Sequence, residues 1–309
     1  MAPGRMHTLL VPLDGSELAE RALGPARQLA AARCASVLLL QVVPHREPRE
    51  QPGEAAQLEA AHHYLSGVAD RLRGQGVTVL VEACAGRPAE QIAEQAEQWR
   101  SELIVMSTHG RGGLGRLVHG STAAAVVRNS SVPVLLVPAR CGARPEIAGE
   151  TILVPVDSSA LAEAALGPAA ELARELAIPV TVLQAVWYAP SRVEGLAVSL
   201  DRIDWMVAAA RLYVDGLATR LRAAGVDARG EVLVAPPVAA IREQADELRA
   251  AVIVMATHGR GALGRFALGS VSDEVLTATS HPVMLVRAEE TAGSTAAAAA
   301  APVPKEACA

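Results

Sequence analysis

The chain has 309 residues, of which 51% are apolar and 20% charged, and its formal net charge is −5. At roughly 150 residues per domain this length favours two domains, and the composition is typical of a globular protein. With three Trp, three Tyr and one Phe, and no basic excess, the chain lacks the surfaces that nucleic-acid binding requires. No apolar run approaches the ~18 residues of a membrane-spanning helix, and the N-terminus lacks a secretion signal. We therefore expect a cytoplasmic protein that binds neither nucleic acid nor membranes.

The sequence contains an internal duplication. Residues 8–43 align without gaps on 151–186, with 20 of 36 positions identical, and residues 108–121 match 257–270. The repeat unit is far longer than the ~20 to 50 residues of a solenoid, so the chain is predicted to hold two copies of one domain. We expect a first domain over 1–138, a linker over 139–150, a second domain over 151–287 and a disordered Ala-rich tail over 288–309.

Each copy alternates short Val/Leu/Ile runs with amphipathic stretches, as in βαβ units that build a parallel sheet buried on both faces. Strands are expected in the first copy at 8–13, 36–43, 77–83, 102–107 and 133–138. Helices are expected between them at about 16–33, 54–74, 88–100 and 117–130. Strands of the second copy are expected near 151–156, 180–187, 227–234, 251–256 and 282–287. The predicted fold class is α/β, with two tandem five-stranded parallel open sheets that carry helices on both faces.

Local signals indicate where several helices begin and end. Ser16 is a predicted N-cap, Pro88 suits a helix's first turn, and the glycines at 74–76 end the second helix. Pro25 and Pro168 fall inside helical patterns, so we expect the first helix of each copy to kink or restart there.

The strongest chemical signal follows the fourth strand of each copy, where a Gly-rich turn leads into a helix. Such a turn directs backbone N–H groups and a helix N-terminus at one point, which favours an anion. The alternative is that the glycines only permit a tight connection. The turn lacks the lysine of a P-loop, so binding with little turnover is expected. The candidate phosphate-binding residues are Gly110, Gly113, Gly120 and Ser121 in the first copy and Gly259, Gly269 and Ser270 in the second.

Two further residue types recur in both copies. Asp14 and Asp157 each follow the first strand, where an Asp can accept hydrogen bonds from ribose or cap a helix. His109 and His258 each precede the first glycine of the turn. They could contact phosphate, act as a general base or be loop histidines bonded to the backbone. No catalytic residue set recurs in both copies, and the four cysteines lack metal-ligand spacing. We therefore assign no catalytic and no metal-ligating residues.

Together these residues resemble the universal stress protein family, and the resemblance covers nearly everything from Thr8 to Arg287. The family's fold is Rossmann-like, of the adenine nucleotide alpha hydrolase type, with ATP at the carboxyl edge of the sheet. Its motif is Gly, two residues, Gly, nine residues, Gly, then Ser or Thr. Both copies match the motif from Gly110 and Gly259 onward, but Ser107 and Ala256 replace the leading glycine.

The resemblance also implies roles for residues on the first two strands. Asp14 and Asp157 would contact the adenosine side of the nucleotide, and Val42 and Ala185 would offer backbone groups to adenine. The second site departs further from the first, because Gly15 becomes Ser158 and residues 86–88 change from Gly-Arg-Pro to Ala-Pro-Pro at 235–237.

The implied function is that of an ATP-binding, nucleotide-dependent stress-response regulator, with Mg²⁺ as a candidate companion of the phosphates. The alternatives are a slow metal-dependent ATPase or phosphoryl-transfer enzyme assisted by Asp14 or His109, and a nucleotide-free interaction scaffold. Family members commonly pair through their last strands. Residues 133–138 would then pair with 282–287 as an internal pseudo-dimer that hides two strand edges, and two chains could associate further as a homodimer.

Overall fold

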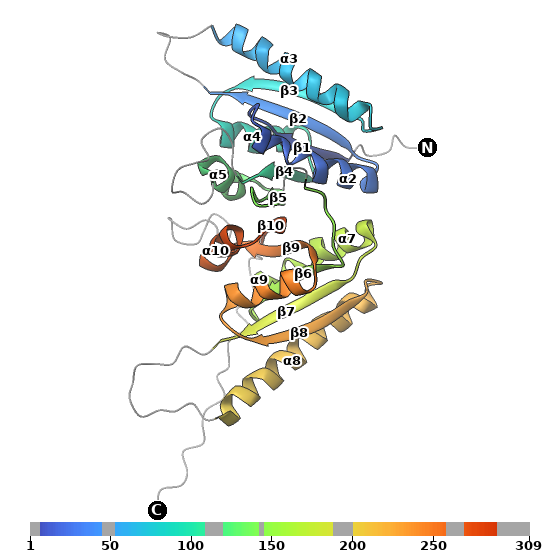
Figure 1. The fold of residues 1–309 in the computed structure, drawn as a ribbon, viewed down its shortest axis with the longest axis vertical. Helices are drawn as coiled ribbons and strands as arrows, with labels where there is room; N and C mark the ends of the chain where they lie inside the picture. The colour runs from blue at the N-terminus through green and yellow to red at the C-terminus, as the bar shows by residue number, and fades with distance from the viewer. Residues whose placement is uncertain are drawn as a thin grey trace, which may run out of the picture.

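The computed structural model describes residues 7–44, 53–108, 120–141, 145–187, 200–257 and 269–288. Within these ranges, ten strands form one sheet in the order β3-β2-β1-β4-β5-β10-β9-β6-β7-β8 (Figure 1). Neighbouring strands are parallel except for the antiparallel pair β5 and β10. The predicted α/β fold class is confirmed, and the two five-stranded sheets are joined edge to edge. Residues 7–138 are called the first half below, residues 139–150 the linker and residues 151–288 the second half.

The elements of the two halves follow the same order along the chain. The first half contains β1 (Thr8–Pro12), α1 (Glu17–Glu20), α2 (Leu23–Arg33), β2 (Ser36–Val43), α3 (Glu54–Arg73), β3 (Val79–Ala85), α4 (Pro88–Gln98), β4 (Leu103–Ser107), α5 (Ser121–Asn129) and β5 (Val134–Val137). The second half contains β6 (Thr151–Val156), α6 (Ala160–Glu163), α7 (Leu166–Leu176), β7 (Val180–Val186), α8 (Leu200–Ala223), β8 (Ala228–Val234), α9 (Pro237–Glu247), β9 (Ala250–Thr257), α10 (Ser270–Ala278) and β10 (Val283–Arg287).

Helix boundaries follow the signals in the sequence. The Ser16 side chain caps α1 by accepting a hydrogen bond from the Ala19 N–H. Pro88 is the first residue of α4, where its missing N–H costs no helical hydrogen bond. The first helix breaks after Glu20 and restarts as α2 at Leu23, two residues before Pro25. These three predictions are confirmed.

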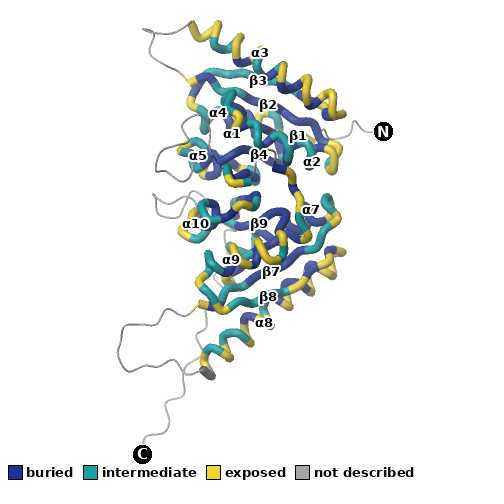
Figure 2. The backbone as a smooth tube through the Cα atoms, in the orientation of Figure 1, coloured by how far each residue is buried: buried dark blue, intermediate teal, exposed yellow. Residues whose placement is uncertain are grey.

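The sheet is buried on both faces by helices, as its continuous apolar strands predicted. Leu9, Val11 and Leu39 belong to one buried cluster, and Leu10 and Leu38 alternate with them into another. Figure 2 shows the strands as the buried centre of the molecule and the outward faces of α3 and α8 as its exposed surface. Burying each large aliphatic side chain contributes about 1.5–3 kcal/mol, so this core holds the sheet edge on which the candidate site depends. Among the helices in the described ranges, none combines the length and apolar character that crossing a membrane requires.

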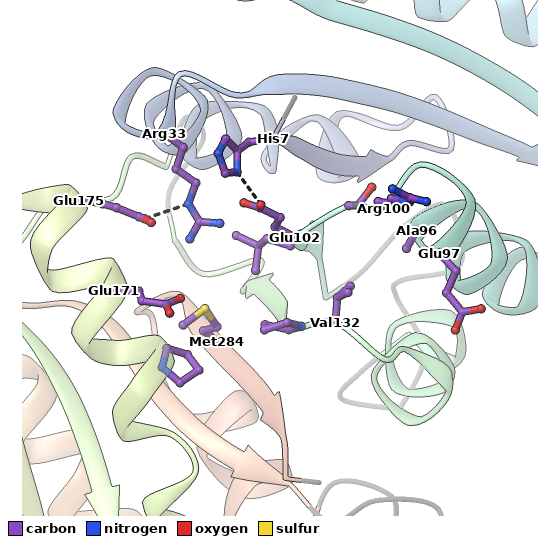
Figure 3. Close-up of a pocket in the computed structure, with 14 residues that line it drawn as sticks. His7, Arg33, Ala96, Glu97, Arg100, Glu102, Val132, Glu171, Glu175 and Met284 are labelled. Carbon is purple, nitrogen blue, oxygen red and sulfur yellow. Dashed lines mark hydrogen bonds and ion pairs between the residues drawn. The ribbon is translucent and has the colours of Figure 1, made fainter. Parts of the chain in front are cut away.

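The halves meet through their last strands, where the expected pairing of residues 133–138 with 282–287 is present. Leu135 lies opposite Met284, flanked by the pairs Val134–Leu285 and Leu136–Val283. The internal repeat, with an offset of 149 residues, makes Leu135 and Met284 equivalent positions of the two halves. Because these equivalent residues face each other across the antiparallel pair, a pseudo-twofold axis passes beside them. Helices α2 and α7 also touch across the junction, where Arg33 Nε lies 2.9 Å from Glu175 Oε2 (Figure 3).

Candidate functional site

Each half contains a topological switch point at the carboxyl ends of its strands. In the first half the strand order reverses between β1 and β4, and in the second half between β6 and β9. In open parallel sheets, ligands bind in the crevice beyond such a reversal. Asp14 follows β1 and Asp157 follows β6. The fold therefore brings each Asp to the switch point of its own half.

Asp14 organises the turn between β1 and α1. Its Oδ1 accepts hydrogen bonds from the Ser16 N–H at 3.0 Å and from the Ser16 hydroxyl at 2.6 Å. Gly15 between them has a φ of 81°, which glycine adopts without strain. Asp14 therefore does not cap the helix itself but orients the serine that does.

The second half repeats this turn with one difference. Asp157 Oδ1 accepts from the Ser159 N–H at 3.0 Å and from its hydroxyl at 2.5 Å, and Ser159 caps α6. Ser158 occupies the position of Gly15 with a φ of 66°, a strained conformation for a serine. The Gln184 amide group donates to the Ser158 hydroxyl at 3.0 Å and supports this turn.

The backbone of Val42 faces the space beyond the end of β1. The Leu40 carbonyl accepts from Leu13 N on the β1 side, whereas the Val43 carbonyl accepts from Gly86 N on the β3 side. Backbone groups alternate along a strand, so those of Val42 point to the same side as those of Leu40. There β1 has already ended at Pro12.

Ala185 repeats this arrangement in the second half. The Pro179 carbonyl accepts from Ile152 N on the β6 side, and the same alternation directs the Ala185 backbone toward that side. The last residue of β6, Val156, pairs with Gln184, which is the residue before Ala185. Both candidate adenine contacts therefore lie where the neighbouring strand has turned away.

A half-buried glutamine in each half, whose side-chain oxygen is itself buried, is a candidate that sequence reasoning missed. Gln41 and Gln184 occupy equivalent positions on β2 and β7, next to Val42 and Ala185. In the described part of the chain, the side-chain oxygen of each is buried without a hydrogen-bond partner. A buried unpaired acceptor costs about 1–3 kcal/mol, so these oxygens need an explanation. Their signal in the sequence was an identical polar residue inside an apolar strand of both copies.

The phosphate end of the expected site includes the first turns of α5 and α10, which the structure describes. Gly120 and Gly269 are the N-caps, and neither helix has a side-chain capping hydrogen bond. Ser121 and Ser270 begin the two helices. Backbone N–H groups in such uncapped first turns can bind an anion.

The two phosphate ends differ in conformation and charge. The Gly120 N–H donates to the Thr108 carbonyl at 2.8 Å, which closes the turn after β4. Gly120 has a φ of −58° and Gly269 a φ of 71°. Asp273 lies in the first turn of α10, whereas that turn of α5 contains no acidic residue. A carboxylate at this point disfavours a second anion.

The remaining predicted site residues lie outside the described residues. These are His109, Gly110, Gly113, His258 and Gly259. The two replacements of the leading motif glycine are described: Ser107 ends β4 and is buried, and Ala256 lies near the end of β9.

A hydrogen-bonded triad holds α1 against α3 close to the Asp14 turn. Tyr64 donates to Glu20 Oε1 at 2.9 Å, and Arg71 donates to Glu20 Oε2 at 2.5 Å. Burial, and then the hydrogen bond to Glu20, raise the pKa of Tyr64 above its ordinary value, with the Asp14 charge contributing in the same direction. The triad therefore fixes the short helix that follows Asp14.

The same triad recurs in the second half. Tyr213 and Arg220 donate to the two oxygens of Glu163 at 3.0 and 2.6 Å, and burial raises the pKa of Tyr213 too. In the described ranges, no three His, Cys, Asp or Glu side chains lie close enough together to hold a metal ion. The described part of the site in each half provides hydrogen-bonding groups and a helix N-terminus.

Fold and site define a duplicated α/β protein with one switch-point crevice in each copy. The model of the universal stress protein family matches residues 6–138 and again 149–287, so the chain belongs to this family. A universal stress protein of Mycobacterium tuberculosis is 27% identical over 305 residues, which cover 92% of this chain and 98% of that protein.

Two solved structures of universal stress proteins are similar to this chain, and the first of them shows the same fold. A universal stress protein from Archaeoglobus fulgidus DSM 4304 matches with a TM-score of 0.67 and 20% identity, over 92% of this chain and 97% of that chain. Another from Archaeoglobus fulgidus, solved in complex with dAMP, is 25% identical over 45% of this chain and 98% of that chain, with a TM-score of 0.34.

Proposed function

We propose that this chain is a nucleotide-dependent stress-response regulator that binds ATP at the switch-point crevices. The observation that carries the proposal is a convergence repeated in both halves. An ordered Asp turn, a strand backbone facing beyond its neighbour and an uncapped helix N-terminus lie at the carboxyl edge of the strands. In this proposal they would bind the ribose, the base and the phosphates of one nucleotide.

Each part of the nucleotide is assigned to particular residues. Asp14 Oδ1 is held by its two hydrogen bonds from Ser16, and the carboxylate would accept a further hydrogen bond from a ribose hydroxyl. The backbone of Val42 would bond the adenine edge, and the carbonyl oxygen of the Gln41 side chain would accept from a base N–H after a small rearrangement. The phosphates would lie against the first turn of α5, with Mg²⁺ shared among their oxygens.

The proposal is for binding rather than rapid turnover. Phosphoryl transfer needs cationic groups on the transferring phosphate and a group that positions the nucleophile. The turn after β4 lacks the P-loop lysine, and Arg71, the cation of the triad near Asp14, is already paired with Glu20. Bound ATP would then persist long enough to bias a surface recognised by another protein.

The nucleotide content of freshly purified protein tests the proposal. The chain is denatured, the protein removed, and ATP, ADP and AMP are quantified per chain by ion-exchange chromatography. We expect mainly ATP, with metal-dependent ADP release near background. Predominant ADP with metal-dependent release would favour the slow enzyme. A chain without nucleotide, whose melting temperature ignores added ATP and AMP, would contradict nucleotide binding altogether.

A further inference from the structure

A glutamine side chain lies beside the Asp turn of the second half. The Gln184 amide nitrogen donates to the Ser158 hydroxyl at 3.0 Å, and Ser158 stands between Asp157 and Ser159, whose hydrogen bonds form the turn. A hydroxyl can donate as well as accept, so this contact holds for either orientation of the amide. Gln184 therefore lies between the strand backbone proposed for the base and the carboxylate proposed for the ribose.

The first half places Gln41 in the equivalent position. Pro12 pairs with Leu40 just as Pro155 pairs with Leu183, so both glutamines follow the same register of the first two strands. The hydrogen bonds within the two Asp turns also have nearly equal lengths. Gln41 therefore lies beside its Asp turn as its counterpart does in the second half.

The two halves differ in the residue that faces the glutamine. The repeat maps Ser158 onto Gly15, and glycine has no side chain with which to hold an amide. The backbone is similar, with a φ of 66° at Ser158 and 81° at Gly15. A serine keeps such a left-handed conformation only where its surroundings hold it there. Among the described residues, the hydrogen bond from Gln184 is the contact that does so.

The glutamine amides give a reason to expect a ligand beside them. The side-chain oxygens of Gln41 and Gln184 are buried without a hydrogen-bond partner in the part of the chain that the structure describes. Such an amide gains a partner when a ligand offers hydrogen-bonding groups. Gln41 can turn toward a ligand without leaving a bond to its turn, whereas Gln184 must first give up Ser158.

We propose that Gly15 and Ser158 set the nucleotide affinity of their halves through the glutamine beside each. When nucleotide binds, Gln41 contacts its adenosine part, whereas the Ser158 hydroxyl competes with the nucleotide for Gln184. This rests on the proposed nucleotide site and names the residue pair that weakens the second copy of it. The competition acts on adenosine, so it is separate from the charge of Asp273, which acts on phosphate.

The test measures adenosine and ATP binding to each half of the full ¹⁵N-labelled chain. Amide chemical shifts of residues 13–20 report the first half, and those of residues 156–163 report the second. Gln41→Leu should weaken both ligands in the first half about fivefold, the factor expected of one lost hydrogen bond. Gln184→Leu should change the second half by less than about twofold, because Ser158 already holds that amide.

Variants of the hydroxyl position test the competition itself. Ser158→Ala keeps the Cβ and removes the hydroxyl, so it should tighten both ligands in the second half about fivefold. That gain should disappear in the double variant Ser158→Ala/Gln184→Leu, which has no amide to release. In the first half, Gly15→Ser should weaken both ligands more than Gly15→Ala does. Gly15→Ala is the matched control, because it adds the same strained Cβ without the hydroxyl.

Unfolding in urea without nucleotide distinguishes ligand contact from a structural role. Gln41→Leu should keep or raise the urea midpoint, because it removes a buried oxygen that has no described partner. The effects of Ser158→Ala and Gln184→Leu on the free energy of unfolding should not add, because both changes remove the same hydrogen bond.

The results separate failure of the glutamine contacts from failure of nucleotide binding. If neither ligand shifts the amides of either half, nucleotide binding is wrong and the glutamine contacts are wrong with it. If ligands bind but ignore Ser158→Ala, or respond alike to Gln41→Leu and Gln184→Leu, only the glutamine contacts are wrong. Effects seen with ATP and not with adenosine, or additive effects on unfolding, would also overturn these contacts alone.

Discussion

The two halves share the frame of the proposed site and differ where phosphates would bind. Both hold an Asp turn with nearly the same hydrogen-bond lengths and a Tyr-Glu-Arg triad beside it. The first half has an acid-free first turn on α5, whereas the second has Asp273 at the start of α10. The two halves therefore agree in the hydrogen bonds of the proposed adenosine side and differ in the charge of the proposed phosphate side, which makes the first half our stronger candidate for ATP.

The largest expected difference concerns two equivalent helical glycines, Gly24 beside the linker and Gly167 in the second half. Gly24→Ala should destabilise the chain by about 1–3 kcal/mol, because the new methyl group overlaps the Pro145 carbonyl. Gly167→Ala should instead stabilise it by about 0.5–1 kcal/mol through helix propensity. Urea unfolding of both variants measures the contrast. Equal effects at the two positions would show that the linker does not pack closely against Gly24.

The next largest effect concerns the two Asp turns. Asp14→Ala should lower ATP affinity by about tenfold, because it removes a ribose acceptor and releases the Ser16 cap. Asp157→Ala should change the total binding less, since the second site is already weaker. Calorimetric titration of each variant separates these effects.

Asp14→Asn is the matched control for the Asp14 turn. Its amide oxygen can still accept from Ser16, so it should keep the stability of the chain and lose only the charge. An unchanged ATP affinity in Asp14→Ala would remove this residue from the site.

A charge exchange between α5 and α10 tests the phosphate side directly. Ala124→Asp places a carboxylate in the first turn of α5, at the position that Asp273 occupies in α10. It should lower ATP affinity in the first half by about fivefold, and Asp273→Ala should raise that of the second half by a similar factor. Adenosine, which has no phosphate, is the control ligand and should bind all three proteins alike. The helix N-termini are not phosphate sites if ATP behaves as adenosine does.

The smallest effect is expected from the triads. Tyr64→Phe and Tyr213→Phe should each cost about 0.5–1 kcal/mol of unfolding free energy, because one hydrogen bond to a partly exposed Glu is lost. The raised pKa of both tyrosines means that the folded chain keeps their protons longer than the unfolded chain does. Their contribution is therefore complete below about pH 10 and is lost as the pH rises further.

Unfolding measured at several alkaline pH values checks that sign. The double Tyr→Phe variant should lose less stability above about pH 10 than the parent chain. A parallel decline of the two proteins would mean that these hydroxyls do not titrate differently in the folded and unfolded states.

Much of the fold followed from local patterns in the sequence. The duplication and the parallel strands were predictable, because apolar runs and repeats report burial directly, whereas the pairing of the last strands was expected from the resemblance to the family. So were the Ser16 cap and the restart of the helix before Pro25. Asp14 was recognised as a turn residue, but its role of orienting Ser16 needed the actual geometry.

Contacts between distant elements were not predictable in the same way. Glu20 meets Tyr64 and Arg71 only because α1 packs against α3, and no local pattern encodes that packing. The same holds for Gln28, whose partner Ile147 lies 119 positions away. The buried Gln41 oxygen was visible in the sequence only as a polar residue in an apolar strand.

Calorimetric titration of nucleotide-free chain with ATP tests the central comparison most directly. The two halves should give two classes of site per chain, the tighter one weakened about tenfold by Asp14→Ala and the weaker one reduced further by Asp157→Ala. Two identical sites that respond equally to both substitutions would contradict the difference between the halves. Absence of binding in both would contradict the proposed function.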